Sequence, residues 1–171
     1  MNIGEEIVAA YLIYFEKCSA VVQNLPINNT GVIDIVGIKG DDVLFCEVAV
    51  HLRTGLRYRQ KGGNVGAIVS KFERIKEFAN EKFKGKKFRY LFFSPLVKKS
   101  GLRDIEEIKS ELKRKKISLE CVLNEDFYMK LGELKEIAAA EKNELKNPAM
   151  RMFQILTKKM NNKKRIKNDY K

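Results

Sequence analysis

The chain has 171 residues, of which 44% are hydrophobic, and its 34 Lys and Arg outweigh 22 Asp and Glu to give a formal net charge of +12. This length suits one globular domain with a proper core, and a strongly basic chain suits a polyanionic partner. No run of about 18 apolar residues occurs and the first residues are acidic rather than basic, so we expect a cytoplasmic protein with no membrane span and no signal peptide. The three cysteines (Cys18, Cys46 and Cys121) are far apart and odd in number, which argues against a disulfide framework or a zinc site.

Hydrophobic periodicity and turn residues predict alternating helices and strands along the chain. A first helix and a first strand, which Pro26 closes or marks as an edge, lead into a β-hairpin around the turn Lys39-Gly40-Asp41-Asp42. A helix, a strand, a helix, a strand and a long helix follow, and Pro148 opens a final helix. The predicted helices are residues 3–17, 65–83, 102–115 and 125–145, and the predicted strands beside the hairpin are residues 20–27, 88–94 and 117–123. The order α-β-β-β-α-β-α-β-α indicates an α/β fold with a mixed sheet flanked by helices.

The predicted hairpin carries one acid in each of its two apolar strands, Asp34 in residues 31–38 and Glu47 in residues 43–51. Antiparallel pairing around the turn brings these positions opposite each other, and the alternation of side chains lets both carboxylates point to one side. A charge among apolar strand residues costs on the order of several kcal/mol unless it is compensated, and a divalent cation compensates two facing carboxylates most cheaply. The pattern predicts a metal site, and the alternative is a pair of solvated acids at strand ends.

These residues resemble the motif of the PD-(D/E)XK nuclease superfamily, which includes restriction enzymes and Holliday-junction resolvases. The resemblance rests on Asp34, on Glu47 about a dozen residues later in a hydrophobic strand, and on a first helix that begins with Gly4-Glu5-Glu6. It covers roughly the first third of the chain and implies a restriction-endonuclease-like fold. Residues 1–146 are then a nuclease-like α/β domain, and residues 147–171 a C-terminal helix and a disordered basic tail.

The resemblance also implies a set of metal ligands. In the family, two acids and a main-chain carbonyl hold Mg²⁺, and these groups correspond here to Asp34, Glu47 and the carbonyl of Val48. Glu5, or otherwise Glu6, is expected near the metal, because small resolvase-like members have a glutamate of the first helix there. One or two Mg²⁺ or Mn²⁺ ions are therefore the expected cofactors.

The sequence departs from the family at Ala49, where the motif has a lysine two residues after the glutamate. That lysine stabilises the attacking hydroxide and the charge of the transition state, which alanine cannot do. A cation from elsewhere in the chain can take this role, because only its position in space matters. The candidates are His51 on the same strand face, Lys71 at the start of the next helix, and Arg53 and Arg57 close by in sequence. The alternative is a fold that binds nucleic acid and has lost catalysis.

A cationic segment without acids, residues 53–64, directly follows the candidate metal site. Its four cations, one aromatic ring and glycines suit a loop that follows a phosphate backbone, with Arg53, Arg57, Tyr58, Arg59 and Lys61 as the nucleic-acid-binding residues. The alternative is a mobile surface loop whose charge is incidental. Residues 157–171 add seven Lys or Arg against one Asp, which predicts salt-sensitive phosphate binding or a solubility tail.

The sequence thus predicts a Mg²⁺-dependent endonuclease, a hydrolase of DNA phosphodiester bonds, with double-stranded or branched DNA as its partner. Asp34, Glu47 and Glu5 are its predicted catalytic acids, and His51 or Lys71 is its predicted catalytic cation. A homodimer is expected if the enzyme cuts both strands of a duplex. The alternative is a non-catalytic nucleic-acid-binding module on the same fold, and a scaffold domain with incidental charge is a third interpretation.

Overall fold

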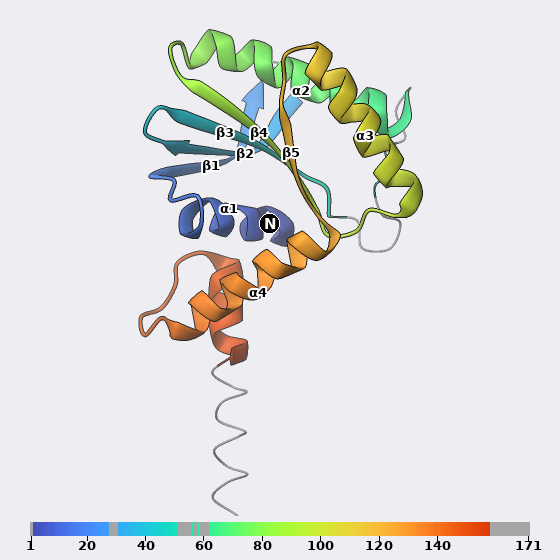
Figure 1. The fold of residues 1–171 in the computed structure, drawn as a ribbon. Helices are drawn as coiled ribbons and strands as arrows, with labels where there is room; N and C mark the ends of the chain where they lie inside the picture. The colour runs from blue at the N-terminus through green and yellow to red at the C-terminus, as the bar shows by residue number, and fades with distance from the viewer. Residues whose placement is uncertain (1, 28–30, 51–55, 57, 59–61, 158–171) are drawn as a thin grey trace, which may run out of the picture.

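The computed structural model of the chain describes residues 2–27, 31–50, 56, 58 and 62–157. Its centre is a five-stranded mixed sheet in the order β1-β2-β3-β4-β5 (Figure 1). The strands are β1 (Ala20–Ile27), β2 (Gly31–Lys39), β3 (Asp42–Val48), β4 (Lys87–Ser94) and β5 (Leu119–Leu123). β1, β2 and β3 are antiparallel neighbours, whereas β3, β4 and β5 run parallel. The architecture is therefore α/β, as the sequence predicts.

Helices cover both faces of this sheet. Parallel neighbours need a crossover connection, and α2 (Gly63–Lys82) joins β3 to β4 while α3 (Lys99–Arg114) joins β4 to β5. Both crossover helices lie on one face, and α1 (Ile3–Tyr14) lies on the other (Figure 1). α4 (Asn124–Ala140) and a helix over residues 148–157 pack on the side of α1 away from the sheet. In the described part of the chain, no helix is both long and apolar enough to cross a membrane.

The core is divided by the sheet because strand side chains alternate between its two faces. On the α1 side, Val8 and Leu12 pack against Leu44 and Phe93. On the α2 side, a larger cluster fills the space between the sheet and the two crossover helices; its fully buried members include Phe45, Phe72, Ile75, Phe92, Ile105 and Ile108. The acids of the hairpin therefore sit beside a well-packed core, which fixes the strands that carry them.

The predicted hairpin is present, with a two-residue turn between β2 and β3 in which Gly40 has a left-handed φ of 59°. The pairs of the β2–β3 ladder end with Ile35 opposite Cys46. One step further along the same register, Asp34 is opposite Glu47. The ladder ends before this pair, but both carboxylates reach the ammonium of Lys71, which confirms that the two acids point to one side.

β2 separates from β3 at this acid pair, while β1 and β2 stay paired beyond it. Asn24, which the register places opposite Asp34, has a left-handed φ of 54°. Val21 packs in the α1-side cluster and Leu25 in the α2-side cluster, although residues four apart on a regular strand share a face. The outer ends of β1 and β2 therefore turn away from β3 as a two-stranded ribbon, and this change of direction falls at the level of Asp34.

The first helix is shorter than predicted, because it ends at Tyr14 rather than at residue 17. Lys17 has a left-handed φ of 59°, and the N–H of Cys18 donates to the carbonyl of Leu12 at 2.9 Å. This is the hydrogen-bonding pattern that closes many helices, with the left-handed residue just after the last turn. The cap leads directly into β1.

The long fourth helix also ends early, at Ala140 rather than at residue 145. The amide of the fully buried Gln154, on the terminal helix, donates to the carbonyls of Glu141 and Asn143 at 2.9 and 2.7 Å. These long-range bonds satisfy carbonyls that a longer helix would otherwise use, so a tertiary contact outweighs the helical pattern of the local sequence.

The third strand ends at Val48, not at residue 51 as predicted. The chain nevertheless stays beside β4 for one more residue. The N–H of Ala49 donates to Phe93 and the carbonyl of Ala49 accepts from the Ser94 hydroxyl, both at 2.9 Å. Glu47 therefore lies at the carboxyl end of β3, and such strand ends are where open α/β sheets commonly bind ligands.

Candidate active site

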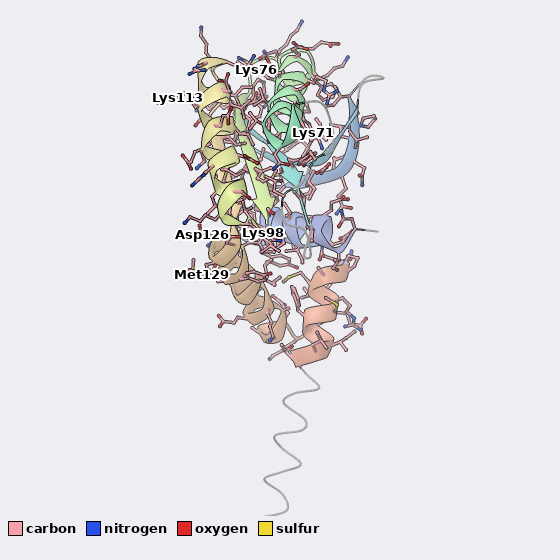
Figure 2. The ribbon with its side chains drawn as sticks, turned by 90° about the vertical axis from the view of Figure 1, so that its right-hand side faces the viewer. Lys71, Lys76, Lys98, Lys113, Asp126 and Met129 are labelled. Carbon is pink, nitrogen blue, oxygen red and sulfur yellow. The ribbon has the colours of Figure 1, made fainter. Side chains whose placement is uncertain are left out.

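Two acids of the hairpin and one lysine of α2 meet at the carboxyl end of β3. The ammonium group of Lys71 is 2.9 Å from Oδ1 of Asp34 and also contacts Oε2 of Glu47. Figure 2 labels Lys71 on α2. The structure thus brings together three residues that the sequence predicts for the site. Lys71, one of the candidates to replace the motif lysine, lies at both acids.

Asp34 is held by the neighbouring strand as well as by Lys71. Its Oδ2 accepts the main-chain N–H of Val48 at 2.8 Å. The N–H of Ala49 points toward β4, so the N–H and the carbonyl of Val48, one residue earlier, point toward β2. The Val48 carbonyl therefore faces the same side as Asp34, as expected of a third oxygen ligand.

Glu47 is the buried member of the pair, with 5% of its surface exposed. Its Oε1 accepts the hydroxyl of Tyr58 at 3.1 Å. Burial, and then the nearby charge of Asp34, raise the pKa of Glu47 to about 7, although Lys71 acts in the opposite direction. Near neutral pH this carboxyl is therefore divided between its protonated and ionised forms.

Lys71 remains charged in this setting. Burial alone would lower its pKa, but Glu47 and Asp34 together raise it above the usual value of 10.5. The ammonium is thus a permanent positive charge between two carboxylates, and its side chain keeps 21% exposure on the pocket side.

A pocket of about 360 Å³ opens in front of these groups, where the β1–β2 ribbon leaves β3. Ala67, Lys71 and Arg74 of α2 line one wall; their spacing of four and then three residues places them on one helix face. The other lining residues are Ile27, Gly31, Val32, Asp34, Glu47 and Tyr58. The pocket therefore combines two carboxylates with two cationic side chains.

Ala49 follows β3 directly and stands where the family motif has a lysine. It is 3% exposed and packs in the α2-side cluster, with its N–H and carbonyl both bonded toward β4. A lysine side chain there would have to displace packed apolar groups. Lys71 reaches Asp34 and Glu47 from α2, which forms one wall of the pocket.

Glu5, the acid predicted from the first helix, is placed differently. Its carboxylate accepts the amides of Asn2 at 2.7 Å and Asn24 at 3.3 Å. It is not among the described residues that line the pocket, because α1 packs on the other face of the sheet. The alternative from the same helix, Glu6, bonds to the amide of Asn147 at 3.1 Å.

The cationic segment lies largely outside the described residues, and this applies to His51, Arg53, Arg57, Arg59 and Lys61. Tyr58 is described, and its hydroxyl is engaged by Glu47 rather than directed away from the site. Burial and Glu47 both raise the pKa of Tyr58, so this hydroxyl stays protonated and can donate.

Sequence reasoning missed Arg74 and the contact between Tyr58 and Glu47. The only local signal for Arg74 is its place three residues after Lys71, which puts both cations on one face of α2. No local pattern signals the hydrogen bond from Tyr58, because it depends on how the segment after β3 returns to the sheet.

The donor set suits a small hard cation. Among the described residues no group of three or more His, Cys, Asp and Glu gathers to hold a metal ion. Two facing carboxylates and the Val48 carbonyl are nevertheless the kind of partial oxygen set that Mg²⁺ accepts, since it keeps several waters and shares substrate phosphates. A carboxylate oxygen can accept from more than one group, so the contacts described above still leave these oxygens able to bind a cation.

Comparison with known proteins adds no assignment: no protein-family model matches the chain, and neither a curated protein nor a solved structure matches it.

Proposed function

We propose that this protein is a metal-dependent nuclease that hydrolyses DNA phosphodiester bonds, on a restriction-endonuclease-like variant of the α/β fold. The contact of Lys71 with both Asp34 and Glu47 carries the proposal. Lys71 supplies from α2 the positive charge that the family motif has two residues after Glu47, where this chain has Ala49. The set of two acids, one main-chain carbonyl and one lysine is then complete in space although it is incomplete in sequence.

Each residue has a definite role in this proposal. Asp34, Glu47 and the Val48 carbonyl would hold Mg²⁺ or Mn²⁺, which when bound makes water more acidic and neutralises phosphate charge. The N–H of Val48 keeps Asp34 oriented toward the pocket. Lys71 places a fixed positive charge where negative charge develops on the attacked phosphate.

Arg74 is the second cation of the pocket and is suited to hold the substrate rather than to react with it. It lies one turn after Lys71 on the same face of α2 and lines the pocket. The planar guanidinium matches the oxygens of a phosphate group and can bind two of them at once. We assign it to the phosphate that carries the scissile bond or to the next phosphate along the strand.

The proposed partner is double-stranded or branched DNA. The net charge of +12 favours a polyanion, and attraction to phosphates of this kind depends steeply on salt concentration. The opening between the β1–β2 ribbon and α2 gives a phosphate direct access to the acids. A homodimer would present two such sites to the two strands of a duplex.

One observation favours a second candidate function, a non-catalytic nucleic-acid-binding module. Lys71 already forms ion pairs with both carboxylates, so the charge of the site is partly compensated without any metal. A chain of this kind would bind DNA through its cations, and Asp34 and Glu47 would serve only to fix Lys71.

A cleavage assay separates the two functions. Supercoiled, linear and branched DNA are incubated with the full chain and Mg²⁺ or Mn²⁺, in parallel with the variants Asp34→Asn and Glu47→Gln. Asp42→Asn is the matched control, because this acid lies in the same hairpin but beside the turn.

Cleavage that is lost in both site variants and kept in Asp42→Asn supports the nuclease. Equal cleavage by Asp34→Asn, Glu47→Gln and the unaltered chain overturns it. Salt-sensitive DNA binding with no cleavage in either ion establishes the second candidate instead.

A further inference from the structure

Tyr58 connects the buried acid of the site to the helices that cover it. Its hydroxyl donates to Oε1 of Glu47 at 3.1 Å, and its main-chain N–H donates to Oδ1 of Asn64 at 2.7 Å. We infer that Tyr58 is a positioning residue that holds Glu47 in the orientation needed to bind the metal ion, an inference that rests on the proposed function.

The two oxygens of Glu47 have different kinds of partner. Oε2 contacts the charged Lys71, whereas Oε1 accepts a neutral hydroxyl. A cation entering between the acids competes with Lys71 for Oε2 but not with Tyr58 for Oε1. The tyrosine therefore keeps one oxygen fixed while the other exchanges its partner, so the carboxylate does not have to be ordered again when the ion binds.

Asn64 in turn fixes Tyr58. Its side-chain oxygen accepts from Tyr58, and its side-chain nitrogen donates to the carbonyl of Leu56 at 3.3 Å and to Oδ2 of Asp104 at 2.5 Å. Asn64 lies in the first turn of α2, and Asp104 lies in α3. One amide thus ties the residues before α2 to both crossover helices, and the position of Glu47 depends on that connection.

Groups that orient a metal ligand in this way contribute measurably to affinity, and their removal typically weakens metal binding about tenfold to a hundredfold. Tyr58→Phe removes the donor and keeps the ring. We expect Mn²⁺ affinity to fall by about tenfold, and the Mn²⁺ concentration needed for half-maximal cleavage to rise by a similar factor. Cleavage at saturating Mn²⁺ should return toward that of the unaltered chain, because excess ion orders the ligand.

The chain offers a closely matched control. The hydroxyl of Tyr11 donates to Glu16, also at 3.1 Å, but from α1 on the other face of the sheet. Tyr11→Phe therefore removes an equivalent Tyr–Glu hydrogen bond without touching the site. If the loss of a Tyr–Glu hydrogen bond weakens Mn²⁺ binding only by destabilising the fold, Tyr11→Phe should weaken it as well.

The experiment titrates Mn²⁺ into the metal-free full chain by calorimetry, without DNA, for the unaltered protein, Tyr58→Phe and Tyr11→Phe. Asn64→Ala is measured alone and combined with Tyr58→Phe. If Asn64 acts through Tyr58, the double variant loses little more affinity than Tyr58→Phe alone.

Weaker Mn²⁺ binding by Tyr58→Phe, with unchanged binding by Tyr11→Phe, supports the inference. Equal affinity of Tyr58→Phe and the unaltered chain overturns it and leaves the nuclease proposal standing. If the unaltered chain binds no Mn²⁺, the proposed function fails and this inference fails with it.

Discussion

Replacing Lys71 by methionine should make the protein bind a divalent cation more tightly while it loses cleavage. Lys71 occupies the space between Asp34 and Glu47, 2.9 Å from Oδ1 of Asp34, so an entering ion has to displace it from at least one acid. Methionine keeps most of the side-chain volume and removes the competing charge. The two effects are opposite in sign, which makes the variant a sharp test.

The magnitude follows from the charges. At an effective dielectric constant of about 20, two unit charges about 4 Å apart interact by about 4 kcal/mol. Lys71 is 21% exposed and can retract toward the pocket, so only part of this energy opposes the ion. We expect Mn²⁺ affinity to rise by about tenfold to a hundredfold, where each factor of ten is about 1.4 kcal/mol. Loss of a preorganised charge at the reacting phosphate should lower kcat by about 10²-fold to 10³-fold.

The assay combines Mn²⁺ calorimetry with cleavage kinetics at saturating Mn²⁺. The control is Lys76→Met in the same helix, because that ammonium donates to the carbonyl of Lys115 at the end of α3 and lies away from the acids. Lys76→Met should resemble the unaltered chain in both measurements. Mn²⁺ binding by Lys71→Met that is no tighter than normal, or cleavage at the normal rate, would refute the assignment of Lys71.

Three further predictions concern the stability of the folded chain and its binding of DNA. The pKa of Glu47 is about 7 in the folded chain, against an ordinary value of 4.5. Between these two pH values the folded state binds more protons than the unfolded state, so the free energy of unfolding falls as pH rises. We expect the metal-free protein to lose up to roughly 3 kcal/mol of stability between pH about 4.5 and about 7. Denaturant unfolding at several pH values should show this loss in the unaltered chain and not in Glu47→Gln, and parallel curves would contradict it. Arg74→Lys keeps the positive charge but loses the planar guanidinium group that can bind two phosphate oxygens at once. It should raise KM for DNA by about tenfold with a smaller change in kcat. A change confined to kcat would instead indicate that Arg74 acts in the chemical step rather than in DNA binding. Arg89→Met breaks the ion pairs of Arg89 with Glu16 and Glu120, at 2.7 and 2.8 Å, on the α1 side of the sheet. This variant should reduce the free energy of unfolding by about 1–2 kcal/mol, a modest loss because the Arg89 side chain is 34% exposed. Altered Mn²⁺ affinity in Arg89→Met would contradict our inference that the α1 side of the sheet is independent of the metal site.

The hairpin and its acid pair could be predicted because the information is local. A two-residue turn at Gly40 fixes the antiparallel register, and the register alone decides that Asp34 is opposite Glu47. The apolar runs on either side of the turn identify both strands. For these reasons the centre of the candidate site follows from about twenty consecutive residues, without knowledge of the rest of the fold.

The other parts of the site depend on distances that no local pattern contains. The sequence offers Lys71 as one of several candidate cations, and the crossover path of α2 over the sheet places its ammonium at both acids. The contacts of Tyr58 with Glu47 and Asn64 depend on how the chain returns from β3 to α2. The early end of α4 depends on Gln154, which lies on a different helix.

The position of the cation that we propose for catalysis is therefore a matter of space rather than of sequence order. Ala49, the residue after β3, packs in the α2-side cluster and has its main-chain groups bonded to β4, so this position serves the core. The ribbon of β1 and β2 leaves β3 at Asp34, and the opening faces α2 instead. Lys71, on the face of α2 that lines the pocket, contacts both acids in this opening. Arg74, one turn later on the same face, adds a second positive charge to this wall. Because the lysine and the arginine share one helix face, a phosphate bound as we propose would meet both cations from one side and both acids from the other.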